Sequence, residues 1–325
     1  MTDLPDGKPA RTLSWLTERF RCPDCHAPGL QQIDAALVCT RCTTAFPLAQ
    51  GRPVLIRTDN DLFPRSSYLK ATLGSTTSQP GILARVAPSR SVNLSYRRNL
   101  RAFAAALSRE GGTSVLVIGA GSQKRWLDKF FLDYPGIRVV YSDVDTRATV
   151  DLFCDAHDLP FQDESFSGVV ASAVLEHVAS PDRVATEMHR VLLSGGFLYT
   201  EIPFLQQVHE GAYDFTRYTL SGHRRLLNHF EELSSGVVAG PGTTLAWALE
   251  HFALCFTPRV LINAVRLAFR TAFFWLKYLD DALAPRPAGV DAASGTFFLG
   301  RRRSEPLPDR EIVHSVYGLG YKYEW

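Results

Sequence analysis

The chain has 325 residues, 46% of them hydrophobic and 21% charged, and a formal net charge of +2. This composition excludes wholesale disorder, and the near balance of charges gives no strong signal for a nucleic-acid partner. The length suggests one main domain with a small additional module. The sequence has no apolar stretch of membrane-spanning length and no signal-peptide segment at its start, so we expect a cytoplasmic protein.

Four of the six cysteines are concentrated in residues 22–42 and form two C-x-x-C pairs separated by 13 residues. Two such turns can place four thiolates around one tetrahedral zinc ion, and a site closed in this way is structural because no coordination position remains for substrate. The alternatives are four unrelated buried cysteines or a redox dithiol, for which a single pair would suffice. We predict a zinc ribbon over residues 13–57 in a reducing compartment. Its structural zinc would be bound by Cys22, Cys25, Cys39 and Cys42.

The sequence from Cys22 to Ile56 resembles the small zinc-ribbon domain that activates tRNA and release-factor methyltransferases and also occurs fused to bacterial methyltransferases. The resemblance covers about residues 20–57. It implies a role in stabilising the protein or in docking a partner. The other two cysteines, Cys154 and Cys255, lie in apolar sequence and are predicted to be core residues.

Residues 58–94 are rich in serine, threonine, proline and glycine and are predicted to be a linker. The main domain then begins with an amphipathic helix over residues 95–110. From residue 113 onward, β-branched apolar runs alternate with helical patterns, which is typical of parallel βαβ units. The predicted strands lie in residues 113–119, 137–143, 167–174, 197–204 and 293–303, and the predicted helices in residues 124–133 and 180–196.

A glycine-containing turn follows the first strand of this domain, at Gly119-Ala120-Gly121. Such a turn lets a cofactor lie directly on the backbone at the carboxyl end of a strand. A dinucleotide fingerprint would require a third glycine at position 124, which is Lys124, so a nicotinamide cofactor is disfavoured. Asp143 lies 24 residues after Gly119, at the end of the next strand, where its carboxylate can accept hydrogen bonds from ribose hydroxyls. The alternative is that Asp143 only caps a turn or a helix.

Residues 155–167 read DAHDLPFQDESFS, and a Leu-Glu-His sequence follows at residues 175–177. This combination resembles class I methyltransferases that depend on S-adenosylmethionine, of the type 11-like group, over about residues 113–220. The resemblance implies that Asp155 and Ala156 contact the adenine and that Ser172 lies near the sulfonium. It also implies that the rest of the cofactor is bound by Gly119, Ala120, Gly121, Asp143 and Val144.

Two positions depart from the pattern of this group. Val117 stands where an acidic residue is usual, and Gln123 stands where the last glycine of the motif is usual. The missing acid would normally orient the amino end of the cofactor, a role that a water molecule can take. One alternative is therefore a non-catalytic scaffold that retains the methyltransferase fold, since a fold alone does not establish activity.

Methyl transfer is an in-line displacement that mainly requires alignment of donor and acceptor and exclusion of water. A hydroxyl acceptor also benefits from a general base, and the candidate catalytic residues near the carboxyl edge of the sheet are His177, His209 and Asp214. Residues 209–219 follow the pattern H-x-x-x-Y-D-F-T-R-Y-T, which resembles methyltransferases from polysaccharide and natural-product clusters. That resemblance implies a sugar or a small metabolite as the acceptor. The alternative is that Asp214 only forms a structural ion pair with Arg217.

Residues 243–285 form a very apolar helical insertion that is interrupted by Pro258. Arg266, Arg270 and Lys277 recur at helical spacing among leucine and aromatic residues, as in a basic amphipathic helix on a membrane surface. One hypothesis is peripheral contact of residues 260–279 with the inner membrane face, which would fit a lipid-linked glycan acceptor. The alternative is a helical lid or a dimer face with a solvated stripe. Residues 304–325 are a tail to which the sequence assigns no role.

These features predict an α/β fold: a doubly wound, Rossmann-like, seven-stranded methyltransferase sheet with a small N-terminal zinc ribbon and a helical C-terminal insertion. The methyltransferase domain would span residues 95–303, with S-adenosylmethionine as cofactor. The predicted function is methylation, on oxygen, of a small molecule or glycan intermediate. An RNA or protein methyltransferase is the alternative, and the near-neutral charge counts against RNA. The sequence indicates neither the identity of the acceptor nor the oligomeric state.

Overall fold

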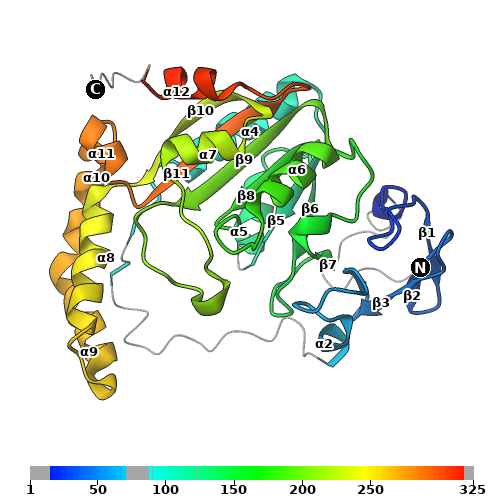
Figure 1. Ribbon diagram of the computed structural model, residues 1–325, viewed down its shortest axis with the longest axis horizontal. Coiled ribbons are helices and arrows are strands. Elements are labelled where there is room, and N and C mark those ends of the chain that lie inside the picture. Colours follow the sequence, from blue (N-terminus) through cyan, green and yellow to red (C-terminus); the bar gives the residue numbers. More distant parts are fainter. Residues whose placement is uncertain (1–14, 71–87, 90, 122, 318–325) are drawn as a thin grey trace. The chain divides into compact units, whose positions relative to one another are not determined.

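The computed structural model describes residues 15–70, 88, 89, 91–121 and 123–317 (Figure 1). The chain forms two compact units. Among the described residues, the first unit contains those within 15–70, 104–171 and 180–198, and the second contains those within 88–103, 172–179 and 199–317. Each unit is therefore assembled from three separate segments of the chain.

The N-terminal part of the first unit is an antiparallel ribbon. Its strands are β1 (Leu30–Ile33), β2 (Ala36–Cys39), β3 (Ala45–Ala49) and β4 (Arg52–Leu55), and the short helix α2 (Arg65–Lys70) follows them. Successive strands of the ribbon pair antiparallel. β4 also pairs in parallel with β7 (Leu152–Cys154), so that Val54 lies opposite Phe153. The ribbon is thus continuous with the main sheet of this unit.

The main sheet of the first unit is built around parallel strands. These are β5 (Ser114–Ile118), β6 (Arg138–Asp143), β7 and β8 (Phe166–Ser172), and the first part of β9 (Leu192–Pro203) lies beside β8. The strand order is β4-β7-β6-β5-β8-β9, and every residue of β5 and β8 is buried, as expected where both faces of a parallel sheet are covered. The order reverses at β5, because β6 and β7 lie on one side of it and β8 on the other. In open α/β sheets, ligands bind at the carboxyl ends of the strands beside such a reversal.

Two helices connect these strands. α5 (Lys124–Phe131) joins β5 to β6, and α6 (Pro181–Val191) joins β8 to β9. Val184, Met188 and Val191 recur every three or four residues of α6 and are buried, so the predicted apolar face is confirmed. Ser180 occupies the N-cap position as predicted, but its side chain makes no capping hydrogen bond.

The second unit contains the last residues of β9 and the antiparallel pair β11 (Gly295–Arg302) and β10 (Phe230–Ala239), in the order β9-β11-β10. The long helix α4 (Tyr96–Arg109) begins in this unit and confirms the predicted amphipathic helix. The other helices of the unit are η2 (Gly211–Tyr213), α7 (Leu220–Leu226), α8 (Pro241–Leu254), η3 (Arg259–Leu261), α9 (Ile262–Phe273), η4 (Phe274–Leu279), α10 (Asp280–Leu283), α11 (Pro287–Asp291) and α12 (Asp309–Tyr317).

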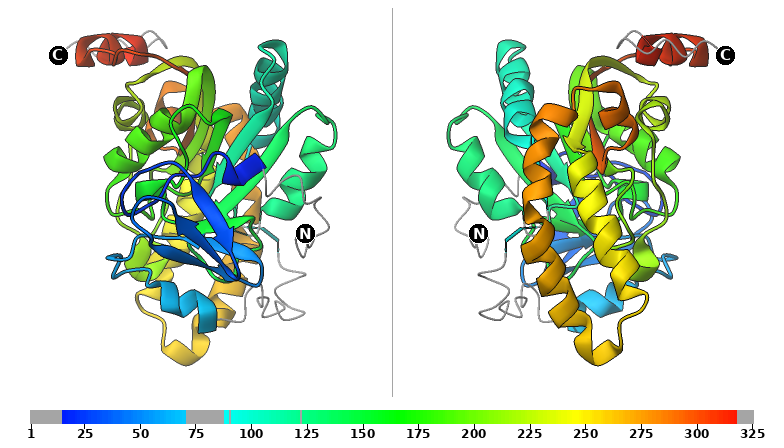
Figure 2. Two further views of the ribbon diagram at one scale, coloured as in Figure 1. Left: turned by 90° about the vertical axis from the view of Figure 1, so that its right-hand side faces the viewer. Right: turned by 90° about the vertical axis from the view of Figure 1, so that its left-hand side faces the viewer.

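The helical insertion folds as a pair of packed helices, α8 and α9, which lie side by side (Figure 2). The fully buried carboxylate of Asp280 accepts hydrogen bonds from the backbone N–H of Gly242 at 2.6 Å and from the Thr243 hydroxyl at 2.6 Å. This carboxylate satisfies donors at the positive end of the helix dipole of α8. A Cβ atom at position 242 would lie 2.1 Å from the Leu276 carbonyl oxygen, so only glycine permits this close approach.

The number of strands differs from the prediction. The described residues form eleven strands and not seven, because the four ribbon strands β1–β4 add to the seven strands β5–β11. The predicted strands and helices of the main domain are otherwise present, except that the helix predicted over residues 180–196 ends at Val191 and residues 192–196 begin β9. The last residues of the tail, 318–325, lie outside the described residues.

Two predictions about single residues are wrong. Cys255 is exposed at the end of α8, whereas Cys154 is buried as predicted. Lys277 does not belong to a solvated basic stripe: it is buried, and its Nζ donates to the Ser89 carbonyl oxygen at 2.7 Å. The helical phase changes where α9 ends at Phe273 and the 3-10 helix η4 begins, which turns Lys277 inward. None of the helices in the described residues combines the length and apolarity needed to cross a membrane.

Candidate active site

The four cysteines of the ribbon converge on one point. Their Sγ atoms all lie within 4.8 Å of one another, with 3.6 Å between Cys22 and Cys42 and 3.6 Å between Cys25 and Cys39. None of the four forms a disulfide. In a tetrahedral zinc site with Zn–S bonds of about 2.3 Å, the sulfur atoms are about 3.8 Å apart. The donor set and its spacing therefore fit a structural zinc ion bound by all four predicted ligands.

The predicted cofactor turn lies between β5 and α5. Gly119 and Gly121 have φ angles of +63° and +47°, a conformation that favours glycine. Gly121 N donates to Asp143 Oδ2 at 2.8 Å, and Asp145 N donates to Asp143 Oδ1 at 2.9 Å. Burial raises the pKa of Asp143. The carboxylate at the end of β6 thus joins the loops that follow β5 and β6, and each of its oxygens retains a lone pair for a further donor.

Val144 and Ala120 are placed by backbone contacts beside this carboxylate. The Val144 carbonyl oxygen accepts a hydrogen bond from the buried Tyr68 hydroxyl at 2.6 Å. The N–H of Ala120, which is buried, donates to the Ser142 carbonyl oxygen at 3.1 Å. Both predicted cofactor residues therefore belong to backbone fixed at the carboxyl ends of β5 and β6.

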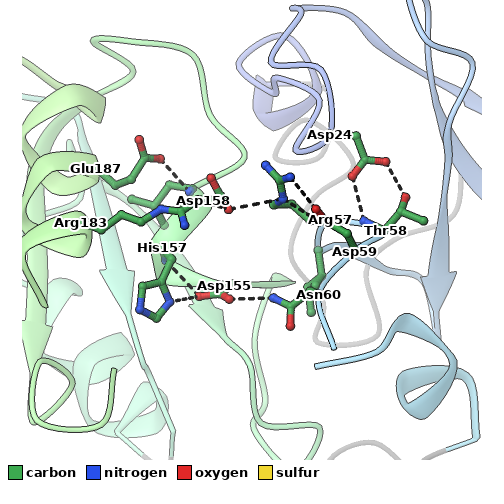
Figure 3. A network of polar contacts seen from close by, with 12 residues as sticks. Asp24, Arg57, Thr58, Asp59, Asn60, Asp155, His157, Asp158, Arg183 and Glu187 are labelled. Carbon is green, nitrogen blue, oxygen red and sulfur yellow. Dashed lines mark hydrogen bonds and ion pairs between the residues drawn. The ribbon is translucent and has the colours of Figure 1, made fainter. Parts of the chain in front are cut away.

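Asp155 follows β7 and lies between two partners (Figure 3). Its Oδ1 accepts from the His157 backbone N at 3.0 Å and is 2.6 Å from His157 Nδ1, while its Oδ2 accepts from Asn60 Nδ2 at 2.8 Å. Burial acts to raise the pKa of Asp155, but the hydrogen bonds from His157 and Asn60 outweigh it and lower the pKa. Ala156, the neighbouring predicted residue, is buried in the short helix η1 (Ala156–Asp158). Three hydrogen bonds leave one acceptor position on Oδ2 for a ligand amine.

The segment that carries Asn60 also contacts the zinc ribbon. Thr58 donates from its backbone N to Asp24 Oδ1 at 2.8 Å and from its hydroxyl to Asp24 Oδ2 at 2.5 Å (Figure 3). Asp24 lies inside the first C-x-x-C turn. On the other side of the segment, Arg57 lies 3.9 Å from Asp158, which also pairs with Arg183 at 2.6 Å. Residues 57–60 therefore connect a zinc-binding turn to the residues predicted to contact adenine.

A cavity of about 180 Å³, lined by both polar and apolar residues, lies in the second unit. One of its walls is formed by Glu201, near the end of β9, whose carboxylate accepts hydrogen bonds from Tyr199 at 2.6 Å, Ser172 at 2.8 Å and Asn93 at 3.1 Å. Burial raises the pKa of Glu201. Ser172, predicted to lie near the cofactor sulfonium, is thus a hydrogen-bond donor to a carboxylate in this cavity wall.

The two histidines predicted as catalytic candidates lie together in the second unit. The rings of His177 and His209 meet edge to face with centroids 4.9 Å apart, and Glu176 Oε1 lies 3.7 Å from His177 Nε2. Burial lowers the pKa of His177 and raises the pKa of Glu176 to about 8. Glu176 and His209 both line the cavity that contains Glu201.

Asp214, the third catalytic candidate, forms an ion pair with Arg217 and accepts a hydrogen bond from the backbone of His209. Both of its carboxylate oxygens are paired with the guanidinium of Arg217, and its Oδ2 also accepts from the His209 backbone N at 2.9 Å. The Arg217 side chain holds the pKa of Asp214 well below its usual range. A carboxylate of such low pKa is a weak base, so the geometry favours a positioning role for Asp214 beside His209.

Sequence reasoning missed three residues of these sites: Asn60, Asn93 and Glu201. Glu201 carried a signal, because it is a charged residue inside an otherwise apolar predicted strand, and such a residue is buried only with partners. The two asparagines lie in polar segments that contain no distinguishing pattern.

Comparison with known protein families matches residues 118–200 to a family described as "Methyltransferase domain". The matched segment begins in β5 and ends in β9, so it includes Gly119, Gly121, Asp143 and Asp155. Comparison with curated proteins finds no match.

Several solved structures are similar to this chain. The [4+2]-cyclase SpnF is 16% identical, with 67% of this chain and 87% of that chain covered and a TM-score of 0.41. A chain from a complex containing the Haloferax volcanii Trm112 methyltransferase activator is 18% identical, with 65% and 94% covered and a TM-score of 0.39. Phosphoethanolamine N-methyltransferase 2 of Haemonchus contortus is 15% identical, with 66% and 54% covered and a TM-score of 0.39.

Likenesses of this size carry no argument about activity, so the assignment rests on the family match and on the strand order and glycine turn of the first unit. The family match and these structural features lie in the same segment of the chain. Residues 118–200 match a methyltransferase domain, and the four cysteines near the N-terminus form a cluster that fits a structural zinc ion.

Proposed function

We propose that this enzyme methylates an oxygen atom of a small polar acceptor, a sugar or another hydroxyl-bearing metabolite, with the cofactor bound at the carboxyl ends of β5, β6 and β7. The observation that carries the proposal is the position of Asp143. Its carboxylate is fixed by two backbone N–H groups beside a glycine turn, at the reversal of strand order where open α/β sheets bind ligands.

The residues of the first unit fit the cofactor. Asp143 would accept hydrogen bonds from the ribose hydroxyls, and Asp155 has one acceptor position left for the adenine amine. Gly119, Ala120 and Gly121 would present backbone to the methionine part, and Val144 and Ala156 would flank the base. S-adenosylmethionine supplies the methyl group, activated by its attachment to a sulfonium.

The cavity of the second unit supports a polar acceptor. A carboxylate with three donors, Glu201, forms one wall, and the cavity also contains Glu176 and His209. Groups of this kind bind hydroxyls by hydrogen bonds, and His177 or His209 would serve as the base that removes the acceptor proton. Ser172 would orient Glu201 and thereby the acceptor.

Binding of S-adenosylmethionine and S-adenosylhomocysteine to the zinc-loaded chain, measured by titration calorimetry, tests the cofactor part of this proposal. We expect micromolar affinity, about −8 kcal/mol, and at least a tenfold loss in Asp143→Ala because hydrogen bonds to a charged group contribute about 2 kcal/mol. The matched control is Asp163→Ala, which removes a carboxylate that is 72% exposed and paired only with Arg190 among the described contacts.

The outcomes separate the enzyme from a scaffold. Equal affinity of Asp143→Ala and the wild-type chain would remove Asp143 from the site. Absence of binding by the folded wild-type chain to either ligand would favour a scaffold that retains only the fold.

A further inference from the structure

A cluster of three metal-ligating side chains lies in the second unit, away from the four cysteines. Glu176 and His177 follow β8, and His209 lies in the loop after β9. One ligand atom from each of the three lies within 4.8 Å of the others. Glu176 is buried, His177 is half-buried and His209 is exposed, so the cluster extends from the interior to the surface of this unit.

Glu176 lacks the partners that a buried carboxylate requires. Its side chain is 1% exposed, it lines the cavity of this unit, and within the described residues neither carboxylate oxygen has a hydrogen-bond partner. An unpaired buried polar group costs on the order of 1–3 kcal/mol, and more when it is charged. Glu201 in the same cavity is, by contrast, satisfied by three donors. A bound cation would satisfy it.

The histidine nearest Glu176 is oriented as a ligand. Nδ1 of His177 lies 2.8 Å from the Tyr213 carbonyl oxygen, which can only accept a hydrogen bond, so this nitrogen carries the proton. Nε2 then carries the lone pair, and it is the nitrogen 3.7 Å from Glu176. Metal-binding histidines are commonly fixed in this way, with the other ring N–H donated to a backbone carbonyl or a carboxylate.

His209 is the third member of the cluster. Its Nδ1 lies 3.4 Å from the Asp214 carboxylate, 3.3 Å from the Gln207 carbonyl oxygen and 3.5 Å from the Gln206 side-chain nitrogen. One of its ring nitrogens lies within 4.8 Å of the ligand atoms of Glu176 and His177. Arg217 Nη2 in turn pairs with Asp214 Oδ2 at 2.8 Å, which holds this carboxylate beside His209.

We infer that Glu176, His177 and His209 form a binding site for one divalent transition-metal ion. Two imidazoles and one carboxylate are a donor set for metals from Mn²⁺ to Zn²⁺, and three protein ligands leave coordination positions open for water or substrate. An organic ammonium group is a poorer fit, because its N–H donors would not use the matched arrangement of two imidazole lone pairs beside a carboxylate.

The metal site would deepen the proposed function, on which its chemical role rests. A metal-bound hydroxyl loses its proton more readily because the cation stabilises the alkoxide. The proton passes to solvent, the acceptor oxygen forms the new O–C bond as the S–C bond of the cofactor breaks, and the sulfur keeps the bonding electrons. The products are the methyl ether and neutral S-adenosylhomocysteine. Under this inference the two histidines are metal ligands and not free bases.

Co²⁺ titration of the full-length chain, with zinc already bound to the ribbon, tests the site without cofactor or acceptor. We expect one Co²⁺ per chain, seen as weak visible d–d absorption without intense thiolate-to-cobalt charge-transfer bands. Glu176→Gln and His209→Ala should each weaken Co²⁺ binding at least tenfold. His251→Ala, which removes a histidine of α8 whose Nδ1 faces the Trp247 carbonyl, should bind Co²⁺ as the wild type does.

This experiment tests the metal site independently of the proposed function. Absence of Co²⁺ binding, binding accompanied only by thiolate charge-transfer bands, or equal affinity in folded Glu176→Gln or His209→Ala would overturn the metal site. Replacing an unpaired buried carboxyl group by an amide of the same size should not destabilise Glu176→Gln, and the exposed His209 provides a second folded variant. Co²⁺ binding without affinity for S-adenosylmethionine would support the site and contradict the proposed cofactor site.

Discussion

Cys39→Ser should release the zinc ion from the ribbon and lower the free energy of unfolding by several kcal/mol. Cys39 is 1% exposed, ends β2 and has its Sγ 3.6 Å from that of Cys25. The binding free energy of structural zinc in small domains is on the order of 10 kcal/mol, and the ribbon strands have only four or five residues each. A ribbon of this size has too small a core to compensate for the metal.

Loss of zinc should also affect the predicted adenine contacts. Asp24, in the first zinc-binding turn, holds Thr58, and residues 57–60 hold Asp155 and Asp158. Backbone hydrogen exchange in residues 57–60 and 155–158 should therefore accelerate, and affinity for S-adenosylmethionine should fall. The control is Cys255→Ser, which removes an exposed thiol outside the cluster. Zinc content measured by mass spectrometry that stays at one per chain in Cys39→Ser, with unchanged exchange, would contradict the structural role.

Acidification should destabilise the folded chain through His223. This α7 residue is fully buried between two hydroxyl groups, with Nε2 2.8 Å from Thr200 Oγ1 and Nδ1 3.1 Å from Thr296 Oγ1. Burial lowers the pKa of His223 from 6.5 to about 3. Between these two values the unfolded chain binds a proton that the folded chain does not, so stability is lost as the pH falls, at up to about 1.4 kcal/mol per pH unit. Above pH 6.5 the residue contributes no pH dependence.

His223→Gln isolates this effect, because a glutamine amide can bond to both threonines but does not titrate in this range. Denaturant titrations give the free energy of unfolding of wild type and variant at each pH. Between pH 7 and pH 5, the wild type should lose about 2 kcal/mol more stability than the variant. Subtraction removes the contributions of the zinc site and the other carboxylates that the two proteins share. Parallel pH profiles would show that His223 becomes protonated in the folded state and would contradict the prediction.

The features that could be predicted from the sequence are those encoded over short distances along the chain. The two C-x-x-C turns, the glycine turn at Gly119 and the apolar face of α6 each need only local residues, and the structure contains all three. The position of Asp143 at the end of β6 followed from the alternation of strands and helices. Adding four ribbon strands to the sheet could not be predicted, because the pairing of β4 with β7 joins residues about 100 positions apart.

The polar networks around the candidate sites could not be predicted from the sequence. Asn60 contacts Asp155 across 95 residues and Asn93 contacts Glu201 across 108, and asparagines in polar segments are too common to indicate such contacts. Lys277 was misjudged because a change from α-helix to 3-10 helix moves a side chain to another face without a clear signal in the sequence. Glu176 was visible in the Leu-Glu-His motif, but its lack of partners is a property of the folded chain alone.

The central claim is that the carboxyl ends of β5, β6 and β7 bind S-adenosylmethionine. A crystal structure of the zinc-loaded chain with S-adenosylhomocysteine tests it most directly. We expect ribose hydroxyls within hydrogen-bond distance of Asp143, the adenine amine near Asp155 Oδ2 and the amino-acid part on the backbone of residues 119–121. A ligand bound elsewhere, or Asp143 still contacting only Gly121 and Asp145 with no ligand beside it, would contradict this cofactor site.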